Sequence, residues 1–160
     1  MTAAEKEIWA ALATIQDPEI PVLTLVEMKI VRAIEAQGKR VRVVMSPTFV
    51  GCPALETMKA AVRERLGALG FDDVAIEITF TPPWSTDMLE PATREKLRVY
   101  GVAPPPPIGD DLGASLARPV ACPSCGSTNT RVQSLFGATL CKQLFICGNC
   151  RQPFERFKPV

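Results

Sequence analysis

The chain of 160 residues contains no histidine. This absence excludes Ser-His and Cys-His nucleophile pairs, acid/base catalysis by an imidazole, and most catalytic zinc sites, which need at least one histidine ligand. The formal net charge is only +1, so the chain as a whole has no attraction for polyanions such as nucleic acid.

Long apolar runs are also missing. No run approaches the roughly 18 residues of a membrane span, so we expect no membrane association. The charged start of the chain does not resemble a targeting signal, and we therefore expect a cytoplasmic protein. In that compartment thiols stay reduced, so paired cysteines at ligand spacing indicate a metal site more often than a disulfide.

Composition changes near residue 102. Residues 1–101 carry 12 Lys and Arg against 14 Asp and Glu, whereas residues 102–160 carry 6 against 3 and hold five of the six cysteines. Four consecutive prolines, at 104–107, exclude a helix and favour a stiff extended segment. We therefore predict three parts: a first domain at 1–102, a proline-rich linker at 103–119, and a zinc ribbon at 120–160.

Hydrophobic periodicity in the first hundred residues alternates between helical and strand-like stretches. The order αββαβα predicts an α+β fold in which helices cover one face of a small mixed sheet. The expected elements are a helix that starts at a capping box of Thr2 and Glu5 and ends before Pro18, strands on either side of 37–39, a helix from Pro53 to Gly67 or Gly70, a strand over 74–80, and a helix from Pro91 to Gly101. In the second strand Val41, Val43 and Met45 are expected to point inward, and in the last helix Leu97 and Tyr100.

Two Cys-x-x-Cys turns, separated by 21 residues, supply four candidate metal ligands: Cys122, Cys125, Cys147 and Cys150. Two intervening residues allow both sulfurs of a turn to face one ion, and four thiolates complete a tetrahedron that leaves no position for water. The pattern predicts a structural zinc ion. Disulfides, inert thiols, or an iron site with four cysteine ligands are the alternatives. Residues 131–134 and 143–146 are the expected ribbon strands.

Residues 118–160 hold 6 basic side chains and 1 acidic side chain. Their net charge is therefore +5, of which a zinc ion with four thiolates offsets about two. Nucleic-acid binding is compatible with the remaining charge but not demanded by it. The ribbon's phenylalanines fit a core or a protein-docking face as well as a stacking platform. Cys141 lies outside the two turns and is interpreted as a small buried hydrophobic residue.

Cys52 is the one cysteine of the first domain. Placed before Pro53, it is predicted to be the N-cap of a helix, where free amides and the helix dipole lower a thiol's pKa and favour a nucleophile or metal ligand. The alternative is an inert, buried cap residue. Its candidate partners in metal binding are the carboxylates of Asp17 and Glu19, the hydroxyl of Thr48, or a cysteine from another chain. From its proline-rich loop, Trp84 is interpreted as a lid over the core.

Three segments of the first domain carry a resemblance to a known family. Asp17-Pro18-Glu19-Ile20-Pro21, residues 46–53 and residues 83–87 resemble the SufT-like metal-sulfur cluster assembly domain family. With the two Cys-x-x-Cys turns and residues 136–142, nearly the whole chain is similar to the D-subunit family of bacterial phenylacetyl-CoA epoxidase, also called phenylacetate-CoA oxygenase.

The resemblance implies an accessory or maturation subunit in aerobic phenylacetate catabolism, with Cys52 as the family's motif cysteine and Asp17, Glu19, Thr48 and Trp84 around it. Its implied partners are the iron-sulfur reductase and the di-iron oxygenase of the system, and its cargo is iron or a transient iron-sulfur cluster. A homodimer is left open. We expect no catalytic activity of the chain itself, since no general base accompanies Cys52. A purely structural or regulatory subunit is the alternative.

Overall fold

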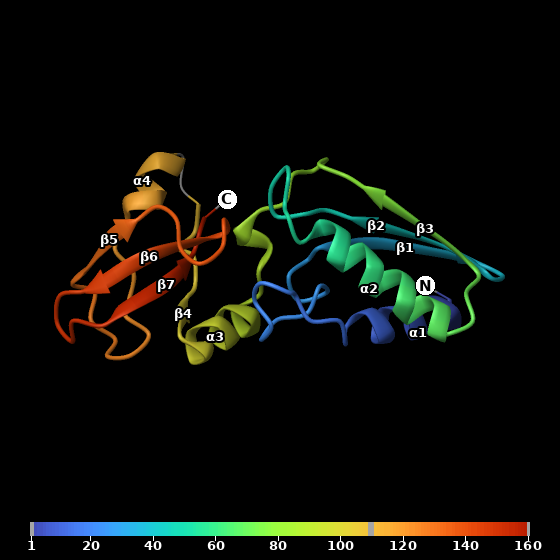
Figure 1. Cartoon of the computed structure of the whole chain (residues 1–160), viewed down its shortest axis with the longest axis horizontal. Helices are drawn as coiled ribbons and strands as arrows, with labels where there is room; N and C mark the ends of the chain where they lie inside the picture. The colour runs from blue at the N-terminus through green and yellow to red at the C-terminus, as the bar shows by residue number, and fades with distance from the viewer. Residues whose placement is uncertain (1, 109–110, 160) are drawn as a thin grey trace. The chain divides into compact units, whose positions relative to one another are not determined.

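The computed structural model describes residues 2–108 and 111–159 and forms two compact units, Met1–Trp84 and Ser85–Val160 (Figure 1). The predicted α+β class and the element order αββαβα over the first hundred residues are confirmed. Among the described residues, no helix has the length and apolar character required to cross a membrane.

The first unit is a three-stranded sheet with two helices on one face. Strand β2 lies in the centre, antiparallel to β1 and parallel to β3, and α2 makes the crossover between the two parallel strands. Helices α1 and α2 lie side by side over the sheet (Figure 1). The elements are α1 (Ala3–Leu12), β1 (Val31–Gln37), β2 (Arg40–Met45), α2 (Leu55–Ala68) and β3 (Asp73–Ile78).

Local sequence signals explain most of these elements. Thr2 Oγ1 accepts the Glu5 N–H at 3.1 Å while a Glu5 carboxylate oxygen accepts the Thr2 N–H at 2.7 Å, so the capping box starts α1 as expected. Gly38, at φ 60°, turns the chain between β1 and β2. Along β2, Val41, Val43 and Met45 are fully buried, which confirms the alternation expected from the sequence.

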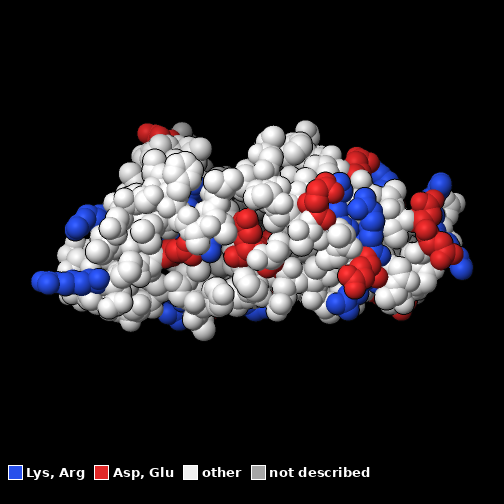
Figure 2. All heavy atoms as spheres, in the orientation of Figure 1, with Lys and Arg blue, Asp and Glu red and all other residues white. Residues whose placement is uncertain are grey.

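The opposite face of this sheet carries a row of exposed ion pairs. Arg42 pairs with Glu35 at 2.8 Å and with Glu77 at 2.6 Å, and Arg40 pairs with Asp73 at 2.5 Å. Figure 2 shows charge of both signs interspersed over the first unit. Exposed pairs of this kind contribute little stability, so their main consequence is a polar, wet sheet face.

The second unit is built on a four-stranded sheet of order β4-β7-β6-β5, in which β7 and β6 are the central strands. One hydrophobic cluster of this unit consists of Ala103, Val120, Cys122, Phe145, Cys147 and Phe154. The elements are the 3-10 helix η1 (Thr86–Met88), α3 (Pro91–Tyr100), β4 (Val102–Ala103), α4 (Leu112–Ala117), β5 (Thr130–Ser134), β6 (Lys142–Cys147) and β7 (Pro153–Phe157).

The stretch interpreted as a linker is folded onto the ribbon strands. Strand β4 pairs in parallel with β7, α3 contacts β4, and the guanidinium of Arg156 donates to backbone carbonyls at 115, 116 and 118. The two compact units divide at residue 84, so α3 belongs to the second unit. Tyr100, expected to point inward, is 54% exposed. The three-part division at 102 and 119 stays a prediction about independent folding.

Candidate metal centre and thiol site

Four cysteine sulfurs converge at one end of the ribbon sheet. Cys147 ends β6, Cys150 lies in the turn before β7, and the other two flank the turn that precedes β5. All four sulfurs lie within 4.8 Å of one another, with Cys122 and Cys150 at 3.7 Å and Cys125 and Cys147 at 3.6 Å. Four thiolates about 2.3 Å from a single ion stand about 3.8 Å apart at the corners of a tetrahedron. The donor set therefore fits one tetrahedral metal ion.

Backbone amides of both turns stabilise the thiolates. The N–H of Ser127, together with the side-chain amide of Asn149, lowers the pKa of Cys125 to about 6. Amides of Cys150 and Asn149 lower the pKa of Cys147 in the same way. Sequence reasoning does not single out Asn149, although its position inside the second turn is a usable signal. The turns therefore favour charged sulfurs at Cys125 and Cys147. At Cys150, the amide of Gln152 acts in the same direction, but burial and the other three cysteines raise the pKa to about 12.

Cys52 lies in the loop that joins β2 to α2, at the carboxyl ends of the two parallel strands. The N-cap of α2 is Ala54, so the prediction that Cys52 caps the helix is wrong by two residues. The Cys52 carbonyl accepts the Leu55 N–H at 3.2 Å in the turn that leads into α2. Pro53 and Ala54 form a turn before α2 and are not its first residues.

The structure brings Asp17 and Glu19 into electrostatic contact with the Cys52 thiol. Burial raises the pKa of Cys52, and the carboxylates of Glu19 and Asp17 raise it further, while amides of Ala54 and Leu55 act in the opposite direction. The predicted lowered pKa is therefore wrong, because desolvation and two like charges outweigh the helix amides. At neutral pH this thiol is protonated.

Asp17 also shapes its own loop. Its Oδ1 accepts the N–H groups of Glu19 at 2.9 Å and Ile20 at 2.8 Å, and the residue is 6% exposed. This arrangement is an Asx turn, in which the side chain replaces a backbone acceptor. The carboxylate therefore fixes the segment that carries Glu19, and Pro18 and Pro21 confine the same segment further.

Trp84 and Thr48 are the other two residues predicted to lie around Cys52. Trp84 is buried, and its Nε1 donates to the Met28 carbonyl at 2.7 Å, which makes it an anchor of the core. Thr48 is half-buried in the loop between β2 and Cys52. In the same loop Ser46 is fully buried, and its hydroxyl is the single buried side-chain N or O atom of the described chain that lacks a hydrogen-bond partner. The turn motif contains Ser46, but no sequence signal assigns it a role.

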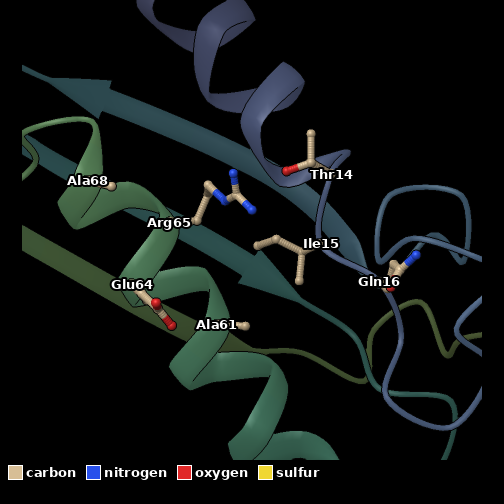
Figure 3. Close-up of a pocket in the computed structure, with 7 residues that line it drawn as sticks. All are labelled: Thr14, Ile15, Gln16, Ala61, Glu64, Arg65 and Ala68. Atoms are coloured by element: carbon tan, nitrogen blue, oxygen red, sulfur yellow. The ribbon is translucent and has the colours of Figure 1, made fainter.

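The thiol and its two carboxylates do not form a ready three-ligand cage. Among residues 2–108 and 111–159, the four ribbon cysteines are the single group of three or more His, Cys, Asp or Glu residues whose ligand atoms could share one ion. A separate groove of about 360 Å³ runs between the end of α1 and α2, lined by residues that include Ile15, Glu64 and Arg65 (Figure 3). No cysteine lines it, and its two charges are opposite in sign, so it adds no chemistry to the thiol site.

Comparisons with known proteins match both parts of the chain. Residues 5–78 match the family described as "Iron-sulfur cluster assembly protein", and residues 110–158 match the "PaaD zinc beta ribbon domain". A relative from Escherichia coli K12, the putative D subunit of 1,2-phenylacetyl-CoA epoxidase, is 43% identical over 154 residues, covering 96% of this chain and 92% of the relative. The chain belongs to this D-subunit family.

Other similarities concern the first part of the chain. An "Fe-S protein maturation auxiliary factor" from Porphyromonas gingivalis is 32% identical over 87 residues, which cover 53% of this chain and 82% of that protein. A domain of unknown function from Bacillus anthracis shares the fold with a TM-score of 0.55 at 22% identity, covering 59% of this chain and 92% of that one. A conserved hypothetical protein from Thermotoga maritima has a TM-score of 0.51 at 28% identity, covering 61% and 94%.

Each of the two family matches contains part of the predicted site residues. The cluster assembly match contains Asp17, Glu19, Thr48 and Cys52, and the ribbon match contains the four metal ligands. Trp84 lies in neither matched range. The ribbon match begins at residue 110 and so includes α4, which agrees with the folding of that helix onto the ribbon strands. Cys141 is 8% exposed just before β6, as expected for a small buried residue.

The raised pKa of Cys52 predicts slow alkylation. At neutral pH a maleimide should modify Cys52 more slowly than a free cysteine, whose pKa is about 8.5, because the thiolate is the reacting form. Glu19→Gln removes one of the charges that raise the pKa and should accelerate the reaction. Peptide mass spectrometry along a pH series measures both rates. Modification of wild-type Cys52 as fast as the free thiol would show that the helix amides dominate after all.

Proposed function

We propose that the chain is an accessory maturation factor of the phenylacetyl-CoA epoxidase system, whose first unit receives iron or an iron-sulfur cluster at Cys52 and passes it to a partner subunit. The observation that carries the proposal is that the Cys52 thiol lies within electrostatic range of the carboxylates of Glu19 and Asp17, inside residues that match an iron-sulfur cluster assembly family. The names of two relatives, the putative D subunit of 1,2-phenylacetyl-CoA epoxidase and the Fe-S protein maturation auxiliary factor, point in the same direction.

The electrostatics of the site suit a cargo that is positively charged. Asp17 and Glu19 disfavour a free thiolate at Cys52, but the same two carboxylates attract a cation such as ferrous iron. When the cation arrives, its charge outweighs theirs, the thiol loses its proton to solvent, and a sulfur–metal bond becomes favourable. The thiol therefore stays protected by its proton in the absence of cargo and becomes a ligand in its presence.

The geometry also suits transfer more than storage. The thiol and carboxylates do not gather around one point as the ribbon cysteines do, so the chain's own atoms cannot enclose the metal. Remaining coordination positions are then open to ligands of a donor or a recipient protein, and a metal held by few ligands is released readily. Asp17 holds the loop that carries Glu19 through its Asx turn.

The ribbon has a structural role in this proposal. Zinc is the ion that fits four thiolates at tetrahedral spacing with no open position, and such a site supplies folding free energy instead of catalysis. The partners are the reductase and the di-iron oxygenase of the epoxidase system, in the cytoplasm. The second unit would dock one of them while the first unit delivers the cargo.

A structural or regulatory subunit is the second candidate. The observation in its favour is the burial and raised pKa of Cys52, which are also expected of an inert thiol. An enzyme with Cys52 as nucleophile has less support, because the nucleophile would be protonated at neutral pH and the chain has no histidine to act as its base.

Cys52→Ser separates maturation from a structural role. We expect the variant to fold and to join its partners normally, because serine is close to cysteine in size and Cys52 does not cap α2. In cells that carry the whole phenylacetate operon, it should lower the iron content of the reductase or the oxygenase severalfold and slow growth on phenylacetate. Metal analysis of each purified subunit is the measurement.

Cys141→Ser is the matched control, since Cys141 is also outside the metal site and should leave partner iron unchanged. Cys52→Ala should behave like Cys52→Ser, because neither side chain caps the helix. Normal iron in every partner and full growth with both Cys52 variants would reject the maturation role and favour the structural subunit.

A further inference from the structure

The loop between β5 and β6 exposes an apolar surface. Leu135, Phe136 and Leu140 are 52%, 64% and 50% exposed within one short loop of the ribbon. Scattered exposed apolar residues are common, but three large ones in six positions form a concentrated patch of the kind that marks a binding surface. The Nζ of Lys158 lies 4.4 Å from the centre of the Phe136 ring. We call Leu135, Phe136, Leu140 and Lys158 together the Phe136 surface.

This loop is held in place without burying its apolar side chains. The Gly137 N–H donates to the Lys142 carbonyl at 2.8 Å, and the Ala138 N–H donates to Glu155 Oε1 at 2.7 Å. Gly137 lies so close to β6 and β7 that a Cβ there would stand 2.7 Å from Glu155 Oε1. Lys142 fixes the same carboxylate through an ion pair of 2.8 Å. A loop fastened in this way presents a preorganised surface, which lowers the entropic cost of binding.

The charge beside this surface is positive and lacks a partner within the described residues. No carboxylate in 2–108 or 111–159 forms an ion pair with Lys158, which covers the Phe136 ring instead. Glu155, the one acidic residue of 118–159, is already engaged by Lys142 and Ala138. A partner that brings carboxylates would therefore pair with Lys158 and meet no opposing charge on the loop.

We propose that the Phe136 surface docks a protein partner that offers an apolar pocket bordered by carboxylates. Nucleic acid is a poorer occupant, because Lys158 covers one face of the Phe136 ring and two leucines offer no platform for stacking bases. A second copy of the chain is poorer as well, because self-association would bring two Lys158 ammonium groups toward the same interface. That the partner is a subunit of the epoxidase system rests on the proposed function.

Site-specific photocrosslinking tests the surface directly. The full chain with Phe136→p-benzoylphenylalanine is mixed with each other purified subunit of the phenylacetyl-CoA epoxidase system. The matched control is Val99→p-benzoylphenylalanine, since Val99 is 72% exposed on α3 of the same unit. We expect one subunit to crosslink from Phe136 and not from Val99. The crosslinked peptide should contain apolar residues with Asp or Glu beside them.

Affinity measurements complete the test. Joint Phe136→Ser and Leu140→Ser should weaken binding of that subunit at least about tenfold, as expected when central apolar contacts are lost, whereas Val99→Ser should not. Lys158→Gln should slow association and reduce its salt dependence. Unchanged affinity in the double variant, binding of no subunit, or a crosslink only to nucleic acid or to a second copy would overturn the proposal.

The same preparations distinguish this proposal from the maturation role. Cys52→Ser should bind the partner as tightly as the wild type, since Cys52 lies in the first unit. If Cys52→Ser leaves partner iron normal while Phe136 still crosslinks, maturation fails and docking stands. If partner iron falls with Cys52→Ser but the double variant binds normally, docking fails and maturation stands. Unchanged metal content of the double variant confirms that its ribbon is folded.

Discussion

Cys125→Ser is expected to leave the chain without its bound metal and the ribbon unfolded. A serine hydroxyl is a poor ligand for zinc, and three thiolates do not close the tetrahedron that the four sulfurs form. The ribbon's hydrophobic cluster is small and includes two of the metal ligands, Cys122 and Cys147, and a region of about 40 residues rarely folds by apolar burial alone. Bound zinc supplies about 10 kcal/mol or more to such modules, so its loss should unfold the ribbon outright.

The effect should remain within the second unit. Met1–Trp84 has its own sheet and its own core, so far-UV circular dichroism should retain the contribution of α1 and α2. Strand β4 should be released with the ribbon, because its partner is β7. Metal analysis and limited proteolysis measure the two effects, and Cys141→Ser is the control. Full zinc in the variant, or a protease-resistant ribbon without zinc, contradicts this interpretation.

Local signals in the sequence are sufficient for the elements that depend on neighbours along the chain. The capping box at Thr2, the glycine turn at Gly38 and the two Cys-x-x-Cys turns each contain their own structural reason within a few residues. The same holds for the buried alternation of β2. These features set the fold class and the metal ligands before any tertiary contact is considered.

Features that depend on distant contacts are predicted less well. The sequence predicts a lowered pKa for Cys52 because the helix is the visible neighbour, whereas burial and Glu19, 33 positions earlier in the sequence, decide it. Tyr100 satisfies the helical periodicity of α3 but is exposed. Ser46 and Asn149 are visible as parts of motifs, yet their buried hydroxyl and sulfur contact are properties of the folded chain.

The proline-rich stretch shows the same limit. Its composition correctly excludes helix at 104–107, but composition does not reveal that two arginines hold it. Arg94 Nη1 donates to the Pro105 carbonyl at 2.5 Å, and Arg156, on β7, donates to the carbonyls around the end of α4. Both contacts bring a side chain to backbone acceptors far away in sequence, which periodicity cannot report.

Arg156 is the most deeply engaged charge of the second unit. It is fully buried, and its five N–H groups meet five acceptor contacts: two on Gln143 Oε1 and one each on the carbonyls of Ser115, Leu116 and Arg118. The guanidinium also lies 4.6 Å from the centre of the Phe145 ring. Burial lowers the pKa of Arg156 to about 10, so the group stays charged at neutral pH. Neutral acceptors and an aromatic ring thus take the place of a counter-ion.

Arg156→Met should therefore destabilise the metal-loaded second unit by about 3 to 5 kcal/mol, because three backbone carbonyls and the Gln143 amide lose their buried donors. The rate of backbone hydrogen exchange at residues 112–118 should rise, and the metal should be released at a lower temperature. Both are measured on the full chain. Arg131→Met, an exposed arginine on β5, is the control and should change neither. Slow exchange of α4 in Arg156→Met would mean that the prolines, and not the arginine, hold this helix on the ribbon.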